Sequence, residues 1–354
     1  MKQVESELNK YPPIHFIIGP GRSGTTLLMM LLNHTQGVIA TPEVKHVLFL
    51  KSRVKFSSKK LNTIQPIHDF FSMIKKSSSN PLNQFDLNQL VSELCDIRIE
   101  NYANFAKQVH LSLHKKTALE TDLIIDKNNL YTFYVKELLA LYPDAKFCVS
   151  IRDYRGFVAS NMKSQHQFKA KKSVAYFAEV WNCYIKKIQL FQNELGDKLS
   201  ILRYEDLVVQ PEMEMKKLAN FFSFQYDETC FQFHEQIKET VNNYKQTSNA
   251  DPRIVKKIED LTRPIHSGSI NSWKNILSLN EIIQIESISG NLGKSFGYTE
   301  TLQISPWNRL IKLAMTLPIR LRVKLFFGLR SLKLHHYLNV VKRSIHNKEK
   351  GYSS

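Results

Sequence analysis

A glycine-rich turn between an expected strand and an expected helix constrains the fold of this chain more than any other feature. Residues 14–18 (IHFII) form a short apolar run, residues 19–26 read GPGRSGTT, and the apolar stretch that follows has helical character. Such a turn presents backbone N–H groups and the positive end of a helix dipole to an anion. The sequence therefore predicts a phosphate-binding strand, loop and helix near the start of the chain.

Further strands and helices alternate along the chain. Residues 135–141 have helical character, and residues 146–151 (KFCVSI) read as a buried strand. Residues 199–204 (LSILRY) read as another strand, and a helix is expected after Pro211. Strands that alternate with helices indicate a parallel sheet covered on both faces. We therefore predict an α/β fold, a three-layer sandwich around a mostly parallel sheet.

Positive charge is concentrated at the end of the chain. The 49 Lys and Arg residues against 32 Asp and Glu give a net charge of +17, and residues 305–354 alone carry +10, from eleven basic residues and one acid. This balance excludes an acidic or disordered solvating protein. We expect a boundary near residues 303–306, between a body of residues 1–304 and a basic tail of residues 305–354.

The basic tail begins with a helical pattern that has one apolar face. Four residues share this face at helical spacing: Trp307, Leu310, Ile311 and Ala314. An apolar face on a basic helix is typical of a helix at an anionic membrane surface. It is equally typical of a helix packed on the body of the protein, so both interpretations stay open.

Cysteine usage and hydropathy bear on location. The four cysteines form no C-x-x-C pair, no run of about 18 apolar residues occurs, and the first ten residues lack the apolar region of a signal peptide. We expect a protein of the reducing cytoplasm, peripheral at the inner face of the membrane if the tail binds lipid.

The glycine-rich loop differs from the loop of nucleoside-triphosphate-binding proteins in one position. Gly19 and Gly24 have the spacing of G-x-x-x-x-G-K-[ST], but Thr25 stands where the lysine should be, and a cation is found at Arg22 instead. The loop resembles the 5′-phosphosulfate loop of sulfotransferases that use 3′-phosphoadenosine 5′-phosphosulfate (PAPS). The alternatives are a degenerate P-loop and a purely structural turn.

Three later segments resemble motifs of the same family, in the same order. The segment that starts at Arg152 (RDYRGFVAS) resembles the 3′-phosphate motif, in which an arginine pairs with a serine eight positions on, here Ser160. Residues 203–207 (RYEDL) resemble a segment for which we expect a structural role. Residues 266–275 (HSGSINSWKN) resemble the loop that closes over the nucleotide, although His266 and Ser267 replace two basic residues.

The resemblance implies a P-loop-like sulfotransferase fold and a set of site residues. Glu43, 21 residues after Arg22, matches the catalytic glutamate of tyrosylprotein sulfotransferase-like members, and Lys127 matches the catalytic lysine. The catalytic residues are therefore expected to be Glu43, Lys127 and Arg22. The cofactor-binding residues are expected to be Arg22, Ser23, Gly24, Thr25, Thr26, Arg152, Ser160, Ser267, Gly268, Ser269, Trp273 and Lys274.

The implied chemistry is transfer of a sulfuryl group from PAPS, the co-substrate, to an acceptor hydroxyl. Glu43 would act as the base, and Lys127 and Arg22 would stabilise developing charge. No magnesium-binding carboxylate is recognised, so we predict that no metal is required. The bacterial members that this chain resembles suggest a glycan or a lipid-linked saccharide as the acceptor.

Residues 50–115 are the candidate acceptor-binding region and are expected to be mainly helical. Their aromatic side chains could stack on a sugar or fill a helical core, and a core is expected for most of them: Phe70, Phe71, Phe85, Tyr102 and Phe105.

Three rival functions remain. A protein-tyrosine sulfotransferase is the alternative within the family. A nucleotide kinase is disfavoured by Thr25. An inactive basic module that binds membrane or nucleic acid would explain the tail but not the ordered motifs, and we expect no nucleic-acid partner.

Overall fold

The computed structural model describes residues 11–41, 46–51, 56–57, 60–61, 64–77, 86–96, 99, 101–165, 172–246 and 259–331. The chain divides into two compact units. The first comprises Met1–Tyr131, Val135–Arg152 and Glu194–Ser267, and the second comprises Thr132–Tyr134, Asp153–Asn193 and Gly268–Ser354.

A parallel sheet forms the centre of the first unit. Within the described residues it has five strands, in the order β2 (Val38–Thr41), β5 (Leu123–Lys127), β1 (Ile14–Ile18), β6 (Phe147–Ile151) and β7 (Leu199–Arg203). Every neighbouring pair is parallel. All residues of the first four of these strands are buried, as expected for a parallel sheet with both faces covered. The predicted α/β fold is confirmed, and the sheet is wholly parallel.

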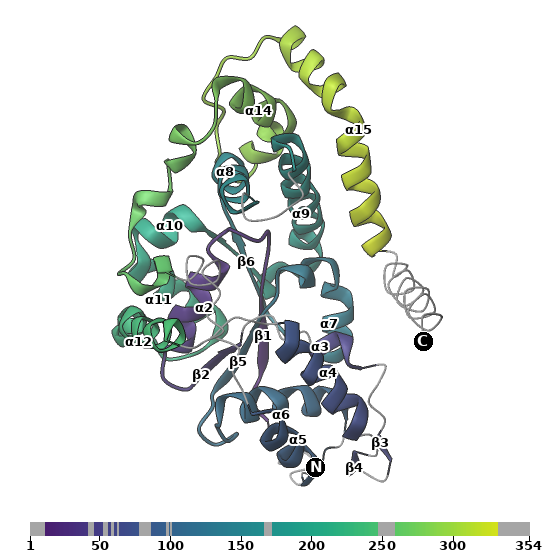
Figure 1. The fold of residues 1–354 in the computed structure, drawn as a ribbon, viewed down its shortest axis with the longest axis vertical. Helices are drawn as coiled ribbons and strands as arrows, with labels where there is room; N and C mark the ends of the chain where they lie inside the picture. The colour runs from purple at the N-terminus through teal and green to yellow at the C-terminus, as the bar shows by residue number, and fades with distance from the viewer. Residues whose placement is uncertain are drawn as a thin grey trace. The chain divides into compact units, whose positions relative to one another are not determined.

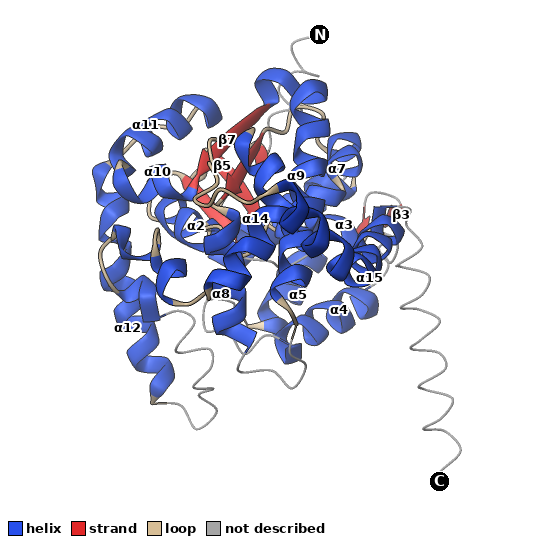
Figure 2. Ribbon diagram, turned by 90° about the horizontal axis from the view of Figure 1, so that it is seen from above, coloured by secondary structure: helices blue, strands red, loops and turns tan. Residues whose placement is uncertain are grey.

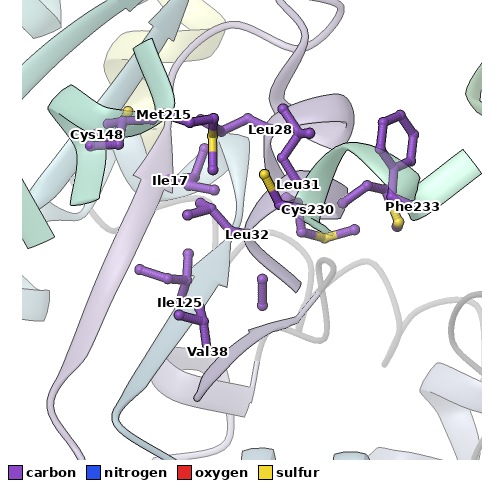
Figure 3. Packing of buried hydrophobic residues seen from close by; sticks show 14 of the residues in the cluster. Ile17, Leu28, Leu31, Leu32, Val38, Ile125, Cys148, Met215, Cys230 and Phe233 are labelled. Carbon is purple, nitrogen blue, oxygen red and sulfur yellow. The ribbon is translucent and has the colours of Figure 1, made fainter. Parts of the chain in front are cut away.

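On one face of the sheet, four described helices of the first unit contribute to one buried cluster with the strands, part of which is drawn in Figure 3. These are α2 (Thr25–Asn33), α10 (Tyr204–Val209), α11 (Pro211–Phe222) and α12 (Phe233–Lys245). Leu28 and Met215 from the helices pack with Ile17 and Ile125 from the strands in a single buried cluster. In Figure 2, α10 and α11 of this unit lie beside the strands of the sheet.

Aromatic rings cover the opposite face. Phe16 of β1 packs against Tyr131, Tyr142 and Phe147, with ring centroids 5.4 to 5.9 Å apart. Tyr131 lies in the short turn η2 (Asn129–Phe133), and Tyr142 follows α7 (Val135–Leu141). The sheet of the first unit is therefore the middle of three layers.

The segment between β2 and β5 is mainly helical, as predicted. It contains α3 (His46–Phe49), a small hairpin of β3 (Phe56–Ser57) and β4 (Lys60–Leu61), α4 (Ile64–Ser77), α5 (Leu87–Asp96) and α6 (Tyr102–His114). The aromatic side chains expected in a helical core are buried there: Phe70, Phe71, Tyr102 and Phe105. Phe85 lies outside the described residues.

Four helices build the part of the second unit that the structure describes (Figure 1). These are α8 (Tyr154–Gln165), α9 (Val174–Leu195), α14 (Leu279–Lys294) and α15 (Pro306–Ser331). Tyr154 packs on Trp181 with ring centroids 5.5 Å apart. A Cβ on Gly293 would lie 2.4 Å from the Tyr154 ring, so α14 approaches α8 at a glycine.

Short 3-10 turns complete the described elements: η3 (Gly196–Lys198), η4 (Glu228–Gln232), η5 (Glu259–Thr262), η6 (Ser267–Ser269) and η7 (Ser272–Asn275). Among the helices that the structure describes, none is both long enough and apolar enough to cross a bilayer. The predicted boundary between residues 1–304 and residues 305–354 stays a prediction, and α15 belongs to the same compact unit as α8 and α14.

Candidate active site

The carboxyl ends of the parallel strands bring several predicted site residues to one edge of the first unit. β1 leads into the glycine-rich loop of residues 19–26, β5 ends at Lys127, and Arg152 follows β6 directly. Ligands of open parallel sheets bind outside this edge. The sequence motifs that carry Arg22, Lys127 and Arg152 thus start from adjacent strands.

The backbone of the glycine-rich loop needs glycine at two places. Gly19 has φ 122°, and a Cβ there would lie 2.3 Å from the Ser150 carbonyl oxygen on β6. Gly24 has φ 78°, and a Cβ there would lie 2.5 Å from the Tyr204 ring. Both positions combine left-handed backbone with close packing, which only glycine tolerates. The Ser150 hydroxyl also donates a hydrogen bond to the Ser23 carbonyl oxygen, which ties the loop to β6.

The loop offers donors that suit an anion. Helix α2 begins at Thr25 with no side-chain cap and no acidic residue in its first turn. The hydroxyl oxygen of Ser23 is buried without a hydrogen-bond partner among the described residues. A buried hydroxyl of this kind and the first N–H groups of a helix are the donors that a phosphate takes. The residues at the loop therefore fit the 5′-phosphate of a nucleotide.

Two arginines add positive charge at this edge. The Arg22 side chain is exposed, yet the protein atoms around it and the positive charge of Arg152 both lower the pKa of its guanidinium, and Asp260 opposes this effect. Arg152 itself is almost completely buried. Two guanidiniums that repel each other favour an anion between them.

Arg152 is held in place by an aromatic ring. Its guanidinium carbon lies 4.5 Å from the centroid of the Tyr204 ring. Since the same ring packs on Gly24, Tyr204 contacts both the loop and the arginine. The structural role expected for the segment around Tyr204 did not include these two contacts. The available signal was the position of Tyr204 directly after a strand of the parallel sheet.

Lys127 is the last residue of β5, and it pairs with Ile17 of the neighbouring strand β1. Its side chain is only 6% exposed, so it does not behave as a solvated loop lysine. Asn129, two residues further on, lies 3.2 Å from the position of a Cβ on Gly21. Burial raises the pKa of Tyr131, which follows Lys127 by four residues, well above its ordinary value. The charge of Asp126, the residue before Lys127, raises it further.

Glu43 lies outside the described residues, so its predicted role as a base is not tested. Thr41, two positions earlier, ends β2. The Thr41 hydroxyl makes hydrogen bonds with His110 Nδ1 at 2.8 Å and His114 Nε2 at 3.1 Å, both from α6. These contacts fix the chain where it leaves the sheet toward Glu43.

The remaining predicted residues lie mainly in the second unit. Ser160 is half-buried on α8, and Trp273 is buried in η7 with the Arg155 guanidinium 4.7 Å from its ring centroid. Lys274 is exposed, as are Ser267 of the first unit and Gly268 of the second, and Ser269 is half-buried. Their contacts with nucleotide stay predictions.

Arg155 organises a buried ion network in the second unit. It forms two hydrogen bonds with Asp153 at 2.6 and 2.9 Å and one with Glu286 at 2.8 Å. Burial disfavours the charge on Arg155, but Asp153 and Glu286 raise its pKa above the ordinary value. The second arginine of the RDYR segment is therefore structural, and it joins α8, α14 and the turn that carries Trp273.

An all-parallel sheet whose first strand leads through a glycine-rich, anion-binding loop into a helix defines the class of P-loop-like α/β proteins. Within this class the chain belongs to the sulfotransferase family, because the model of the "Sulfotransferase family" matches residues 13–228. The predicted family is thus confirmed.

Distant relatives agree with this membership. Protein-tyrosine sulfotransferase A of Caenorhabditis elegans is 23% identical over 82% of this chain and 68% of its own length. Nodulation protein NoeE of Sinorhizobium fredii is 24% identical over 85% of this chain and 69% of its own length. A putative protein-tyrosine sulfotransferase of Caenorhabditis briggsae is 22% identical over 47% of this chain, and the match spans only 57% of that relative.

Two solved structures share the fold. The sulfotransferase domain of the curacin biosynthetic pathway covers 80% of this chain and 98% of its own, with 18% identity and a TM-score of 0.52. The sulfotransferase domain of the Synechococcus PCC 7002 olefin synthase matches 82% of this chain over 96% of its own length, with 18% identity and a TM-score of 0.51. At this identity the likeness supports the fold alone.

Proposed function

We propose that the protein transfers the sulfuryl group of PAPS to an acceptor hydroxyl. The observation that carries this proposal is the meeting of the glycine-rich loop, Lys127 and Arg152 at the carboxyl edge of one parallel sheet. Membership of the sulfotransferase family supports the same reaction. A kinase would need a lysine where the loop has Thr25.

The nucleotide-binding roles follow from the hydrogen-bond donors of the loop and of Arg152. The backbone N–H groups of residues 23–26 and the Ser23 hydroxyl would hold the 5′-phosphate. Arg152, stacked on Tyr204, would form charged hydrogen bonds to the 3′-phosphate with help from Ser160. The turn that carries Trp273 and Lys274 would cover the nucleotide.

The proposed reaction is an in-line displacement at sulfur. The acceptor oxygen forms a bond to sulfur while the bond between sulfur and the bridging oxygen of the 5′-phosphate breaks. Glu43 accepts the proton of the acceptor hydroxyl, and Lys127 and Arg22 stabilise the negative charge on the sulfuryl and bridging oxygens. By analogy with phosphoryl transfer, positioning and charge stabilisation supply most of the catalysis.

For the acceptor we propose a hydroxyl of a glycan or a lipid-linked saccharide. Similarity to nodulation protein NoeE supports an acceptor of this class. A peptide tyrosine is the second candidate, because several relatives are named protein-tyrosine sulfotransferases. A screen of saccharide and tyrosine-containing peptide acceptors with labelled PAPS separates the two.

Calorimetric titration with 3′-phosphoadenosine 5′-phosphate tests the nucleotide site. We expect tight binding that ATP and AMP do not match, and a loss of about hundredfold in the Arg152→Ala variant (about 3 kcal/mol). The matched control Lys186→Ala removes an exposed cation of α9 and should bind normally. Preference for ATP would favour a kinase, and absence of any nucleotide binding would favour an inactive basic module.

Turnover of the Glu43→Gln variant tests the base. We expect loss of sulfuryl transfer with unchanged nucleotide affinity, whereas Glu235→Gln on the exposed side of α12 should leave both unchanged. Full activity of Glu43→Gln would remove Glu43 from the mechanism. The expected independence from metal is tested separately, since activity that a chelator abolishes and Mg²⁺ restores would contradict it.

A further inference from the structure

The outer face of α15 is apolar and exposed to solvent. The large apolar side chains that share this exposure are Trp307, Leu310, Ile311, Met315, Leu321 and Leu325. Trp307 is 70% exposed and Met315 is 71% exposed. The face predicted from the sequence, which starts at Trp307, is therefore the one that points away from the second unit.

The inner face of the same helix is firmly attached to the second unit. Val323 and Phe327 are buried in a cluster with Phe133 and Tyr184. Arg320 Nε lies 2.8 Å from Glu179 Oε2 of α9. The helix therefore packs on its unit and still presents a second apolar face, so the two interpretations drawn from the sequence are compatible.

A second ion pair supports the same orientation. Arg309 Nη2 lies 2.8 Å from Glu300 Oε2, and Glu300 also lies 3.7 Å from Lys294 of α14. Two of the helix's arginines thus turn toward acidic partners of the second unit. The orientation of α15 is held by both apolar and ionic contacts, which keeps the outer face exposed.

Charge indicates which partner suits this face. Residues 305–354 carry +10, and α15 itself contains no acidic residue. Arg322 is exposed on the helix, and Lys312 is half-buried. Contiguous exposed apolar surface marks an interaction site in soluble proteins. A row of apolar side chains bordered by cations matches a surface that is anionic outside and apolar beneath, the interface of an anionic bilayer.

We propose that α15 docks through its outer face on an anionic membrane, with the helix axis in the plane of the interface. Trp307, Met315 and Leu321 would enter the boundary between headgroups and acyl chains. Arg322, which is exposed on the helix, would face the lipid headgroups, and the net charge of +10 on residues 305–354 would favour an anionic surface. This proposal is independent of the sulfuryl-transfer chemistry, because none of these residues belongs to the candidate active site.

Cosedimentation of the full chain with lipid vesicles tests the proposal. Vesicles that contain phosphatidylglycerol should bind the protein, and vesicles of phosphatidylcholine alone should bind it at least about tenfold more weakly. The variants Met315→Glu and Leu321→Glu place a charge on the outer face and should lower binding about tenfold or more. The control Leu119→Glu changes a residue that is 99% exposed in the first unit and should bind normally.

Point substitutions are preferable to removal of residues 305–354. Such a deletion would take Val323 and Phe327 out of a buried cluster and expose Tyr184. Met315 and Leu321 are exposed, so their replacement leaves the packing intact. Unchanged nucleotide affinity in both variants would confirm that the fold is retained.

Tryptophan fluorescence locates the contact. Of the three tryptophans, Trp181 and Trp273 are buried and Trp307 is exposed. Vesicle binding should shift the emission to shorter wavelength, and Trp307→Phe should remove the shift while most binding remains. Binding without a shift would move the contact away from α15 and overturn the proposal. A dimer in solution that Leu321→Glu dissociates would also overturn it, because a second copy would then occupy this face.

Discussion

The guanidinium of Arg152 lies 4.5 Å from the centre of the Tyr204 ring, and that ring fills the space beside Gly24. Tyr204 therefore connects the arginine proposed for the 3′-phosphate with the loop proposed for the 5′-phosphate. The contact joins the ends of β6 and β7 to the start of α2, all in the first unit.

Replacing Tyr204 by leucine should weaken nucleotide binding. Loss of the stacking on Arg152 is expected to lower the affinity for 3′-phosphoadenosine 5′-phosphate about tenfold (about 1.4 kcal/mol). Tyr204→Phe keeps the ring and should retain most of the affinity. Tyr176→Leu is a matched control, because it removes a ring that stacks with Lys172 in the second unit. Calorimetry checks all three variants, and normal binding by Tyr204→Leu would refute the role.

Gly24→Ala should disrupt the loop. A Cβ at this position would lie 2.5 Å from Tyr204, and the φ of 78° is unfavourable for alanine. We expect loss of nucleotide binding in a protein that still folds. Gly196→Ala is the matched control, since Gly196 also has positive φ but has no atom within 4 Å of the added Cβ. If the two variants bind equally well, the close contact with Tyr204 does not shape the site.

Glu286→Gln should destabilise the second unit. Glu286 is fully buried and accepts hydrogen bonds from Arg155, from the backbone N–H and hydroxyl of Thr301 and from the backbone N–H of Leu302. Loss of its charge leaves Arg155 with one buried carboxylate, which should lower the free energy of unfolding by about 3 kcal/mol. Chemical denaturation measures this change.

The exposed pair of Glu212 and Lys216 provides the comparison for that experiment. Glu212→Gln should change the free energy of unfolding by less than about 1 kcal/mol, because exposed ion pairs are weak. Equal effects of Glu286→Gln and Glu212→Gln would show that the buried network adds little stability.

Stability should fall between pH 6.5 and about pH 4. Burial lowers the pKa of His46 and of His114 to about 4, and it also lowers that of His110. Below pH 6.5 these groups take up protons in the unfolded state but not in the folded state, so acid favours unfolding. Each histidine should contribute about 1.4 kcal/mol per pH unit in this window, and the contribution is complete above it.

Substitution of one histidine checks this pH dependence. His114→Gln can keep a hydrogen bond to Thr41 and should flatten the loss of stability between pH 6.5 and about pH 4. His68→Gln, at a side chain that is 40% exposed, should leave the slope as in the unsubstituted protein. A slope that His114→Gln does not change would contradict the assignment.

Local sequence was sufficient for the elements around the loop. The apolar run of residues 14–18, the glycine cluster and the helical pattern after it appear in the structure as β1, the loop and α2. Two strands of the parallel sheet were not predicted, β2 and β5. β2 has only four residues, and β5 ends in Asp126 and Lys127, whose charges hide a buried strand from hydropathy. Their burial results from pairing with β1 and with each other.

The sequence by itself determined the family and the α/β class, because strand periodicity, a glycine-rich turn and ordered motifs are local properties of the chain. Only the tertiary structure decided that Lys127 is buried at the end of β5, that Tyr204 supports Arg152, and that Arg155 is locked between Asp153 and Glu286. It also decided which side of α15 is exposed. These features depend on which elements pack together over long sequence separations, and no local pattern encodes such contacts.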